Sequence, residues 1–261
     1  MTKFFKDAWN ARELIFHIAK SEQKASLFRF FLGEMWYVLV PLAQSLIYFF
    51  LITILFGSQG SKASLNFSFI LMGIMHYSLF SQVSGLVLPS VYNGGQILLQ
   101  VKLNPIILIT SAFCRALQNW VIGVIIFLLY FVIFEDLISY RILIYPFVLL
   151  IFAYFCWVLG VILATLAVYV RDLEKMIPII FQILMYLSPV IYPVSFYPEG
   201  FKTVLLLNPL ASFMAILQWA LLGMEINLTF SLLVIGFWTI LLSWLSGMIF
   251  DYGSKHFTKT L

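Results

Sequence analysis

Long apolar runs constrain this chain more than any other feature of its sequence. A helix needs about 20 mostly apolar residues to cross the hydrocarbon core of a bilayer. Runs of roughly that length lie at 35–57, 67–89, 108–134, 142–169, 176–194 and 228–250. We therefore expect an all-α integral membrane protein with about six transmembrane helices.

The composition excludes several other classes of protein. Of the 261 residues, 63% are hydrophobic and 10% are charged, whereas about 25% of the residues in a soluble domain are charged. This excludes a soluble enzyme, a disordered chain and a nucleic-acid-binding module. The spans leave no room for a second domain, so residues 1–261 are expected to form one transmembrane unit. Cys114 and Cys156 lie inside apolar runs, which indicates packed side chains rather than a disulfide.

Residues 1–30 show a helical period with one apolar face. That face is formed by Phe4, Ala8, Ala11, Ile15 and Ile18. The pattern predicts an amphipathic helix at the membrane interface, with Phe5 and Trp9 as anchors. The alternative is a solvated helix of a small head domain, which we disfavour because no other polar segment is long enough to complete such a domain.

The region 195–227 is apolar but broken. Its breaks are Pro193, Pro198, Gly200, Pro209 and Gly223. We expect two short helices, at 199–206 and 210–222, neither of which is long enough to cross. Re-entrant helices occur only where protein or a water-filled cavity surrounds them. This region is therefore the first candidate for a pore mouth.

The distribution of Lys and Arg predicts the orientation of the chain in the membrane, because cytoplasmic loops carry an excess of both residues. With both chain ends in the cytoplasm, twelve basic residues lie inside and three lie outside. The inner set is Lys3, Lys6, Arg12, Lys20, Lys24, Arg29, Lys102, Arg115, Arg171, Lys175, Lys255 and Lys259. The outer set is Lys62, Arg141 and Lys202. The broken region 195–227 then lies on the outer face.

Two inner loops are candidates for contact with a partner protein. The loop at 91–105 contains Asn93-Gly94-Gly95, then a stretch that can form a short helix, and then Asn104-Pro105. That helix either docks into a groove of another protein or is a plain link at the headgroups. The second loop, around Arg171 and Asp172, is short and alternates in charge, as a solvated turn does.

Sequence motifs for chemistry are absent. The chain has no G-x-x-x-x-G-K-[ST] phosphate loop and no H-E-x-x-H zinc motif. His17, His76 and His256 are far apart, and His76 is expected to be a satisfied polar residue between helices. Arg115 is charged within a span, so it either contacts the phosphate of an incoming lipid-linked substrate or extends to the inner headgroups.

Three stretches resemble one family of membrane proteins. Arg29–Leu42, with Leu32-Gly33, Trp36 and Pro41-Leu42, resembles the first-span region of type-2 ABC exporter permeases for polysaccharides. Tyr169–Ser195 is similar to the Arg-Asp-Leu loop and Ser-Pro turn of that family, and Asn208-Pro209-Leu210 is similar to its Asn-Pro-Leu. One departure is Phe28, Phe30 and Phe31, where relatives often have a more polar stretch.

The resemblance implies a transport subunit that performs no chemistry. Two copies of the chain would form the pore, and two copies of an ABC ATPase subunit would bind the ATP and Mg, with no cofactor in this chain. The inner loop would be the coupling helix. The expected ATPase-coupling residues are Gln96, Ile97, Leu98, Leu99, Gln100, Lys102, Asn104, Pro105, Arg171 and Asp172. The expected outer gate includes Pro193, Tyr197, Pro198, Asn208 and Pro209.

The implied cargo is a polysaccharide on an undecaprenyl-type lipid, foremost an O-antigen, crossing a bacterial inner membrane. Aromatic rings can stack on the C–H faces of sugars, and weak multi-site binding lets a cargo leave. The expected substrate path comprises Tyr48, Tyr77, Tyr186, Tyr192, Trp219 and Arg115.

Other functions remain open at this point. The same scaffold suits export of capsule polysaccharide, teichoic acid, or a smaller lipid or drug. A membrane-embedded glycolipid transferase is a remote alternative, because such an enzyme needs charged residues clustered on one membrane face. Here Glu135-Asp136 is the only adjacent acidic pair, and a solvated loop accounts for it.

Overall fold

Every regular element in the described part of the chain is helical. The computed structural model describes residues 2–29, 35–56, 67–95, 100, 103–134, 140–254 and 257. The α-helices are α1 (Thr2–Asn10), α2 (Arg12–Arg29), α3 (Trp36–Phe56), α4 (Phe67–Gln82), α5 (Ser90–Asn93), α7 (Pro105–Phe134), α8 (Tyr145–Ala167), α9 (Leu173–Leu187), α10 (Glu199–Leu206), α11 (Pro209–Leu222) and α12 (Leu228–Gly253). A π-helix η3 (Val83–Val87) follows α4, and two 3-10 helices are η4 (Tyr140–Ile144) and η5 (Val194–Phe196).

Five helical segments are long and apolar enough to cross a membrane. They are Trp36–Ile54, Phe67–Asn93, Pro105–Phe134, Tyr140–Ala167 and Leu228–Gly253. The bent pair Gly200–Leu206 and Pro209–Leu222 adds a sixth if it counts as one span. The expected all-α integral membrane fold with about six spans is confirmed.

The predicted span at 176–194 is wrong in its extent. Helix α9 has 15 residues and is therefore about 22 Å long at 1.5 Å per residue, short of the ~30 Å hydrocarbon core. It ends because Ser188 is extended, with φ −105° and ψ 153°, as expected for a residue before proline. The apolar residues that follow form a turn against α4 instead of continuing the helix.

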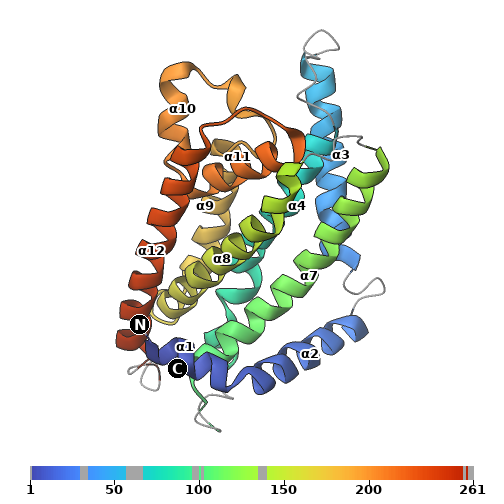
Figure 1. Ribbon diagram of the computed structural model, residues 1–261. Helices are drawn as coiled ribbons and strands as arrows, with labels where there is room; N and C mark the ends of the chain where they lie inside the picture. Colours follow the sequence, from blue (N-terminus) through green and yellow to red (C-terminus); the bar gives the residue numbers. More distant parts are fainter. Residues whose placement is uncertain are drawn as a thin grey trace.

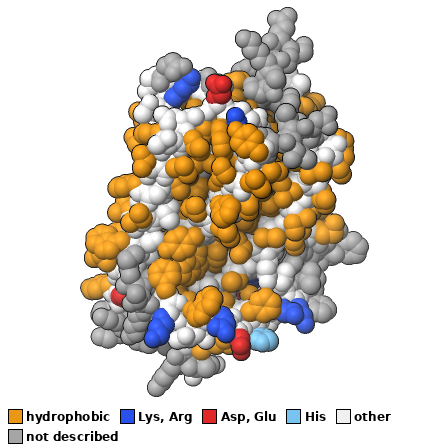
Figure 2. Space-filling view, viewed as in Figure 1, with side chains coloured by type: hydrophobic (Ala, Val, Ile, Leu, Met, Phe, Trp, Pro, Cys, Tyr) orange, Lys and Arg blue, Asp and Glu red, His pale blue; other side chains and the backbone are white. Residues whose placement is uncertain are grey.

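Both chain ends lie at one end of the helix bundle, where α1 and α2 lie across the ends of the long helices (Figure 1). We call this the terminus end. Helices α10 and α11 lie at the opposite end, the far end. Hydrophobic side chains cover the visible face between the two ends, and charged side chains gather at the ends (Figure 2). This is the surface of a multi-pass membrane protein.

Helix α4 within the bundle and helix α11 at its far end are both buried along most of their length. Of the 16 residues of α4, 12 are buried, and α11 is buried almost throughout from Leu210 to Leu221. His76 on α4 is fully buried. Its Nδ1 lies 2.6 Å from the Met72 carbonyl oxygen and its Nε2 lies 2.7 Å from the Tyr145 hydroxyl. The expectation that His76 is a satisfied residue between helices is confirmed.

The N-terminal segment is helical with one buried face, as predicted. Ala8, Ile15 and Ala19 are buried, and α1 and α2 pack against α7. The helix is divided at a turn at Ala11, so one unbroken helix over 1–30 is wrong in detail. The Phe5 ring packs on Tyr154 and Trp157 of α8 at centroid distances of 6.3 and 5.2 Å, so it contacts the bundle. Its role as a membrane anchor stays a prediction.

The two short helices before the last span are confirmed as α10 and α11, which meet at an angle of 102°. Pro209 begins α11, where its lost N–H costs no hydrogen bond. The Asn208 side chain accepts a hydrogen bond from the Leu210 N–H at 3.0 Å. Gly223, with φ +68°, ends α11 in the left-handed conformation that glycine adopts easily.

Candidate functional site

A polar cavity of about 540 Å³ lies between α3, α4 and α9. Aromatic and polar side chains line it together, in a bundle whose other faces are mainly apolar. The aromatic residues are Trp36, Tyr37, Tyr48 and Tyr77, the polar residues are Gln44, Ser78, Ser81, Gln82 and Gln182, and the apolar residues are Val40, Pro41, Ile74, Pro178 and Met185. Aromatic faces pack against apolar C–H surface while amides and hydroxyls form hydrogen bonds. The cavity therefore suits a ligand that is both hydroxylated and partly apolar.

The structure brings four of the predicted substrate-path tyrosines together. Tyr48 and Tyr77 line the cavity, and the Tyr77 hydroxyl donates to the Phe181 carbonyl at 2.7 Å. The hydroxyls of Tyr48 and Tyr186 are 2.9 Å apart, which joins α3 to α9. The Tyr192 hydroxyl in turn donates to the Tyr186 carbonyl. These residues form one connected group from the cavity to the far end.

Trp219 does not join this group. It lies on α11, and the guanidinium of Arg141 stands 5.1 Å from the centroid of its ring. Arg141 also donates to the Gly223 carbonyl at 3.3 Å. Trp219 therefore takes part in a cation–π contact at the far end.

The turn after α9 is held from three directions. Asn208 Nδ2 donates to Ser188 Oγ at 2.9 Å, and Gln218 Nε2 donates to the Pro189 carbonyl at 2.5 Å. On the third side, Gly73 of α4 approaches so closely that a Cβ atom there would lie 1.9 Å from the Val190 carbonyl oxygen. The Ser-Pro turn and the Asn-Pro-Leu segment, separate in the sequence, are thus one structural unit.

Asn208→Ala tests this unit. We expect a loss of about 2 kcal/mol, because the helix cap and the bond to the buried Ser188 hydroxyl disappear together. Asn227→Ala is the matched control, since Asn227 caps α12 through the Phe230 N–H at 3.1 Å at an exposed site. It should cost about 1 kcal/mol. Equal unfolding free energies for the two variants in detergent would contradict a role for the Asn208–Ser188 bond.

The other predicted gate residues surround this unit. Pro193 is buried and precedes η5, and Pro198 is exposed and precedes α10. The Tyr197 ring lies 5.4 Å from that of Tyr192. Burial, followed by the neighbouring Tyr192 hydroxyl, raises the pKa of Tyr197 above its usual value. Its hydroxyl therefore stays protonated at physiological pH.

The described members of the predicted coupling set lie at the terminus end. Helix α5 ends at Asn93, as the Asn-Gly-Gly pattern predicts. Asn104 precedes α7 and donates from Nδ2 to Asp7 Oδ2 at 2.9 Å, which ties this loop to α1. Arg171 and Asp172 form an exposed turn, and Gln100 is exposed. Gln96, Ile97, Leu98, Leu99 and Lys102 lie outside the described residues.

Arg115 has a protein partner that neither interpretation of the sequence includes. Its Nη1 lies 3.1 Å from Glu22 Oε2, which joins α7 to α2. The two side chains line a cavity of about 390 Å³ with residues of η3 and α5, including Ser90 and Asn93. The ion pair is only partly exposed, so solvent screens it less than a surface pair. A role for Arg115 in substrate binding stays a prediction.

Comparison with known proteins identifies the family of the chain. The family described as "ABC-2 type transporter" matches residues 23–222. The chain belongs to this family.

Several relatives are permeases. The chain is 24% identical to the O-antigen export system permease protein RfbA of Myxococcus xanthus, with full coverage of both proteins. It is 26% identical to an O-antigen export system permease protein RfbA of Klebsiella pneumoniae over 79% of this chain and 76% of that protein. A second Klebsiella pneumoniae protein of the same name is 31% identical over 41% of each chain.

As a member of this family, the chain is a transport subunit. The described residues include no group of His, Cys, Asp and Glu side chains that could hold a metal ion.

Sequence analysis missed Gln44, Ser81 and Gln182 in the cavity, Glu22 beside Arg115, and Gln218 at the turn. One signal could have found part of this set. Tyr37, Gln44 and Tyr48 are seven and four residues apart, so they mark one polar stripe on an apolar helix.

Proposed function

We propose that this protein is the transmembrane subunit of an ATP-driven exporter that moves a lipid-linked polysaccharide, foremost an O-antigen, across the bacterial inner membrane. The family and the named O-antigen permeases support the class of function. The single observation that supports a glycan as the cargo is the cavity between α3, α4 and α9, which offers both aromatic faces and hydrogen-bonding groups.

A sugar chain matches this lining. Its hydroxyls can exchange hydrogen bonds with Gln44, Ser81 and Gln182, while its C–H faces pack on the rings of Trp36 and Tyr77. A site for a small lipid or drug needs only a few polar groups among apolar side chains, whereas this cavity has three Gln and two Ser side chains among its lining residues. Each hydrogen bond or ring contact of this kind between the cavity and a sugar is weak by itself. The cargo can therefore move from one set of contacts to the next.

A second copy of the chain would complete the pore. Helices α3 and α9 flank the cavity and leave many large apolar side chains exposed, including Ile47 at 61%, Phe50 at 68% and Ile179 at 60%. In a homodimer, part of this surface would pack against the partner and the remainder against membrane lipids. The undecaprenyl-type carrier would remain in the bilayer while the glycan occupied the pore.

ATP hydrolysis would belong to two copies of a separate ABC ATPase subunit, which would bind the ATP and Mg. This chain lacks the sequence motif of a phosphate loop. The ATPase would bind the terminus end, at the loop 91–105 and the exposed turn at Arg171 and Asp172. The Asn104–Asp7 hydrogen bond would carry motion of that loop to α1.

Both termini would lie in the cytoplasm. Basic residues in the described part of the chain are concentrated in α1, α2 and the turn before α9, all at the terminus end, whereas Arg141 and Lys202 lie at the far end. By the positive-inside rule, this distribution supports a terminus end that faces the cytoplasm. Helices α10 and α11 would face the periplasm.

A gene deletion in cells tests the proposed function. The gene for this chain is deleted, the glycan-synthesis genes are kept, and the lipid-linked polymer is located by fractionation and surface staining. We expect polymer inside the cell and none at the surface, with export restored by a plasmid-borne copy. Polymer of normal length at the surface would contradict glycan export. Loss of polymer inside and outside, with precursor enzymes still active in membranes, would favour the transferase.

A further inference from the structure

A second, apolar groove of about 450 Å³ lies where α1 and α2 cross α7 and α8. It shares no lining residue with the polar cavity described above. Its walls include Phe5, Ala8, Ile15, Phe113, Ala153 and Trp157. The Trp157 indole N–H donates to the Thr110 hydroxyl at 3.3 Å, so it does not require a polar ligand. The groove therefore suits an apolar occupant.

Two cations stand over aromatic walls of this groove. The Arg12 guanidinium lies 5.5 Å from the Trp9 ring centroid, and the Lys20 ammonium lies 6.0 Å from the Phe16 ring centroid. Trp9, Arg12 and Phe16 all line the groove. An apolar slot with two positive charges beside it is complementary to a molecule that has a hydrocarbon chain and an anionic head.

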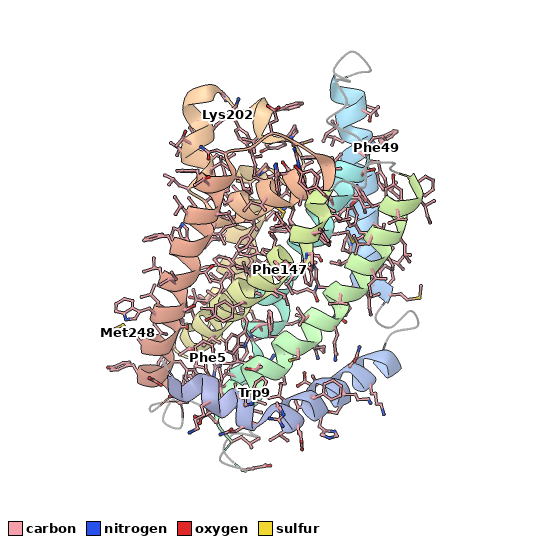
Figure 3. All side chains as sticks on the ribbon, viewed as in Figure 1. Phe5, Trp9, Phe49, Phe147, Lys202 and Met248 are labelled. Carbon is pink, nitrogen blue, oxygen red and sulfur yellow. The ribbon has the colours of Figure 1, made fainter. Side chains whose placement is uncertain are left out.

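The groove adjoins the apolar surface of the bundle. Trp9 and Phe16 are 69% and 53% exposed, and Phe147 of α8 is 66% exposed. Figure 3 shows Phe5 and Trp9 on α1 at the terminus end, with Phe147 farther along the bundle. A hydrocarbon chain can therefore reach the groove from the bilayer, while a headgroup at the level of α1 meets Arg12 and Lys20.

We propose that this groove binds one anionic membrane phospholipid. One acyl chain fills the slot between α1, α7 and α8, and the phosphate contacts Arg12, while Lys20, about 12 Å farther along α2, adds positive charge beside the headgroup. Arginine is well suited to this contact because its guanidinium can donate two hydrogen bonds to a phosphate. Basic sites between membrane helices on the cytoplasmic side commonly hold anionic headgroups. This inference does not depend on the proposed cargo.

Native mass spectrometry of the purified full chain tests the proposal. Phosphatidylglycerol and, separately, phosphatidylcholine are titrated into delipidated protein. We expect Arg12→Gln/Lys20→Gln to weaken phosphatidylglycerol binding about thirtyfold, since each basic residue near an anionic lipid contributes about one kcal/mol. Phosphatidylcholine binding should change little. Lys6→Gln/Lys24→Gln is the matched control, because it removes the same charge from exposed positions of α1 and α2 outside the groove.

A third variant tests the slot itself. Ala153→Leu adds bulk inside the groove and leaves every charge in place, so we expect it to weaken phosphatidylglycerol binding as well. Equal loss of binding in the two charge variants would overturn the proposal, because diffuse surface charge would then explain the lipid. Unchanged binding in Arg12→Gln/Lys20→Gln would also overturn it. So would an Ala153→Leu protein that keeps its lipid but loses self-association, because a second copy would then occupy the groove.

Discussion

Gly73→Val is expected to lower the stability of the folded protein by more than about 3 kcal/mol. The Cβ atom would lie 1.9 Å from the Val190 carbonyl oxygen and 2.8 Å from the carbonyl carbon. The obstacle is backbone, so rotation of a neighbouring side chain cannot relieve the overlap. Overpacking a core usually costs about 1–3 kcal/mol, and more when the backbone must move. For a chain of this length the melting temperature should fall by roughly 6–12 °C or more.

Gly236→Ala is the matched control for this prediction. Gly236 also lies in a membrane helix, but a Cβ atom there meets nothing within 4 Å. Thermal unfolding in detergent, followed by size-exclusion chromatography, compares the two variants. A Gly73→Val protein that melts at the same temperature as Gly236→Ala would show that the turn after α9 is not packed against α4 in the native protein.

Ser81→Trp is expected to reduce polysaccharide export at least about tenfold while the protein still reaches the membrane. Ser81 is an exposed residue on the wall of the polar cavity, so an indole there occupies space needed by the sugar chain. The substitution removes little core packing. Surface polymer, measured by staining of a deletion strain that carries the variant gene, should fall while membrane protein levels do not.

Thr53→Trp serves as the control for added bulk. Thr53 is exposed on α3 and does not line the cavity. Export by this variant should remain close to the wild-type level. If Ser81→Trp exported as well as Thr53→Trp, the cavity between α3, α4 and α9 would not be part of the pathway. Comparable loss in both variants would point to a general effect of tryptophan on insertion.

Most of the fold follows from hydrophobic run length and from Pro and Gly positions. The bounds expected for α10 and α11 agree with the structure to within one residue, because Asn208-Pro209 and Gly223 are strong local signals. Helix α9 was harder to predict. The apolar run continues to Val194, and only the Ser188-Pro189 step ends the helix. Hydropathy reports burial in lipid or protein equally, so it could not show that Val190 packs against Gly73.

The site was less predictable than the fold. Aromatic type and position selected Tyr48, Tyr77, Tyr186 and Tyr192, which lie together in the structure, and also Trp219, which lies apart from them on α11. Their place in a substrate path stays a prediction. Which face of a helix points inward depends on partner helices, and one sequence does not state which helices are partners. Arg115 shows this most clearly, because its partner Glu22 is 93 positions away in the chain. No local spacing links the two residues.

The Tyr48–Tyr186 contact has a consequence for movement of a polymer. Each hydroxyl can donate one hydrogen bond and accept two, as a sugar hydroxyl can. A glycan that passed between α3 and α9 would break this bond and offer each of the two hydroxyls an equivalent partner, so neither hydroxyl would be left unpaired. Tyr186 is 42% exposed, so its side chain can turn aside without a shift of α9 and with little loss of packing. Successive sugar units would then slide along a nearly level free-energy profile, without a deep minimum to arrest the chain.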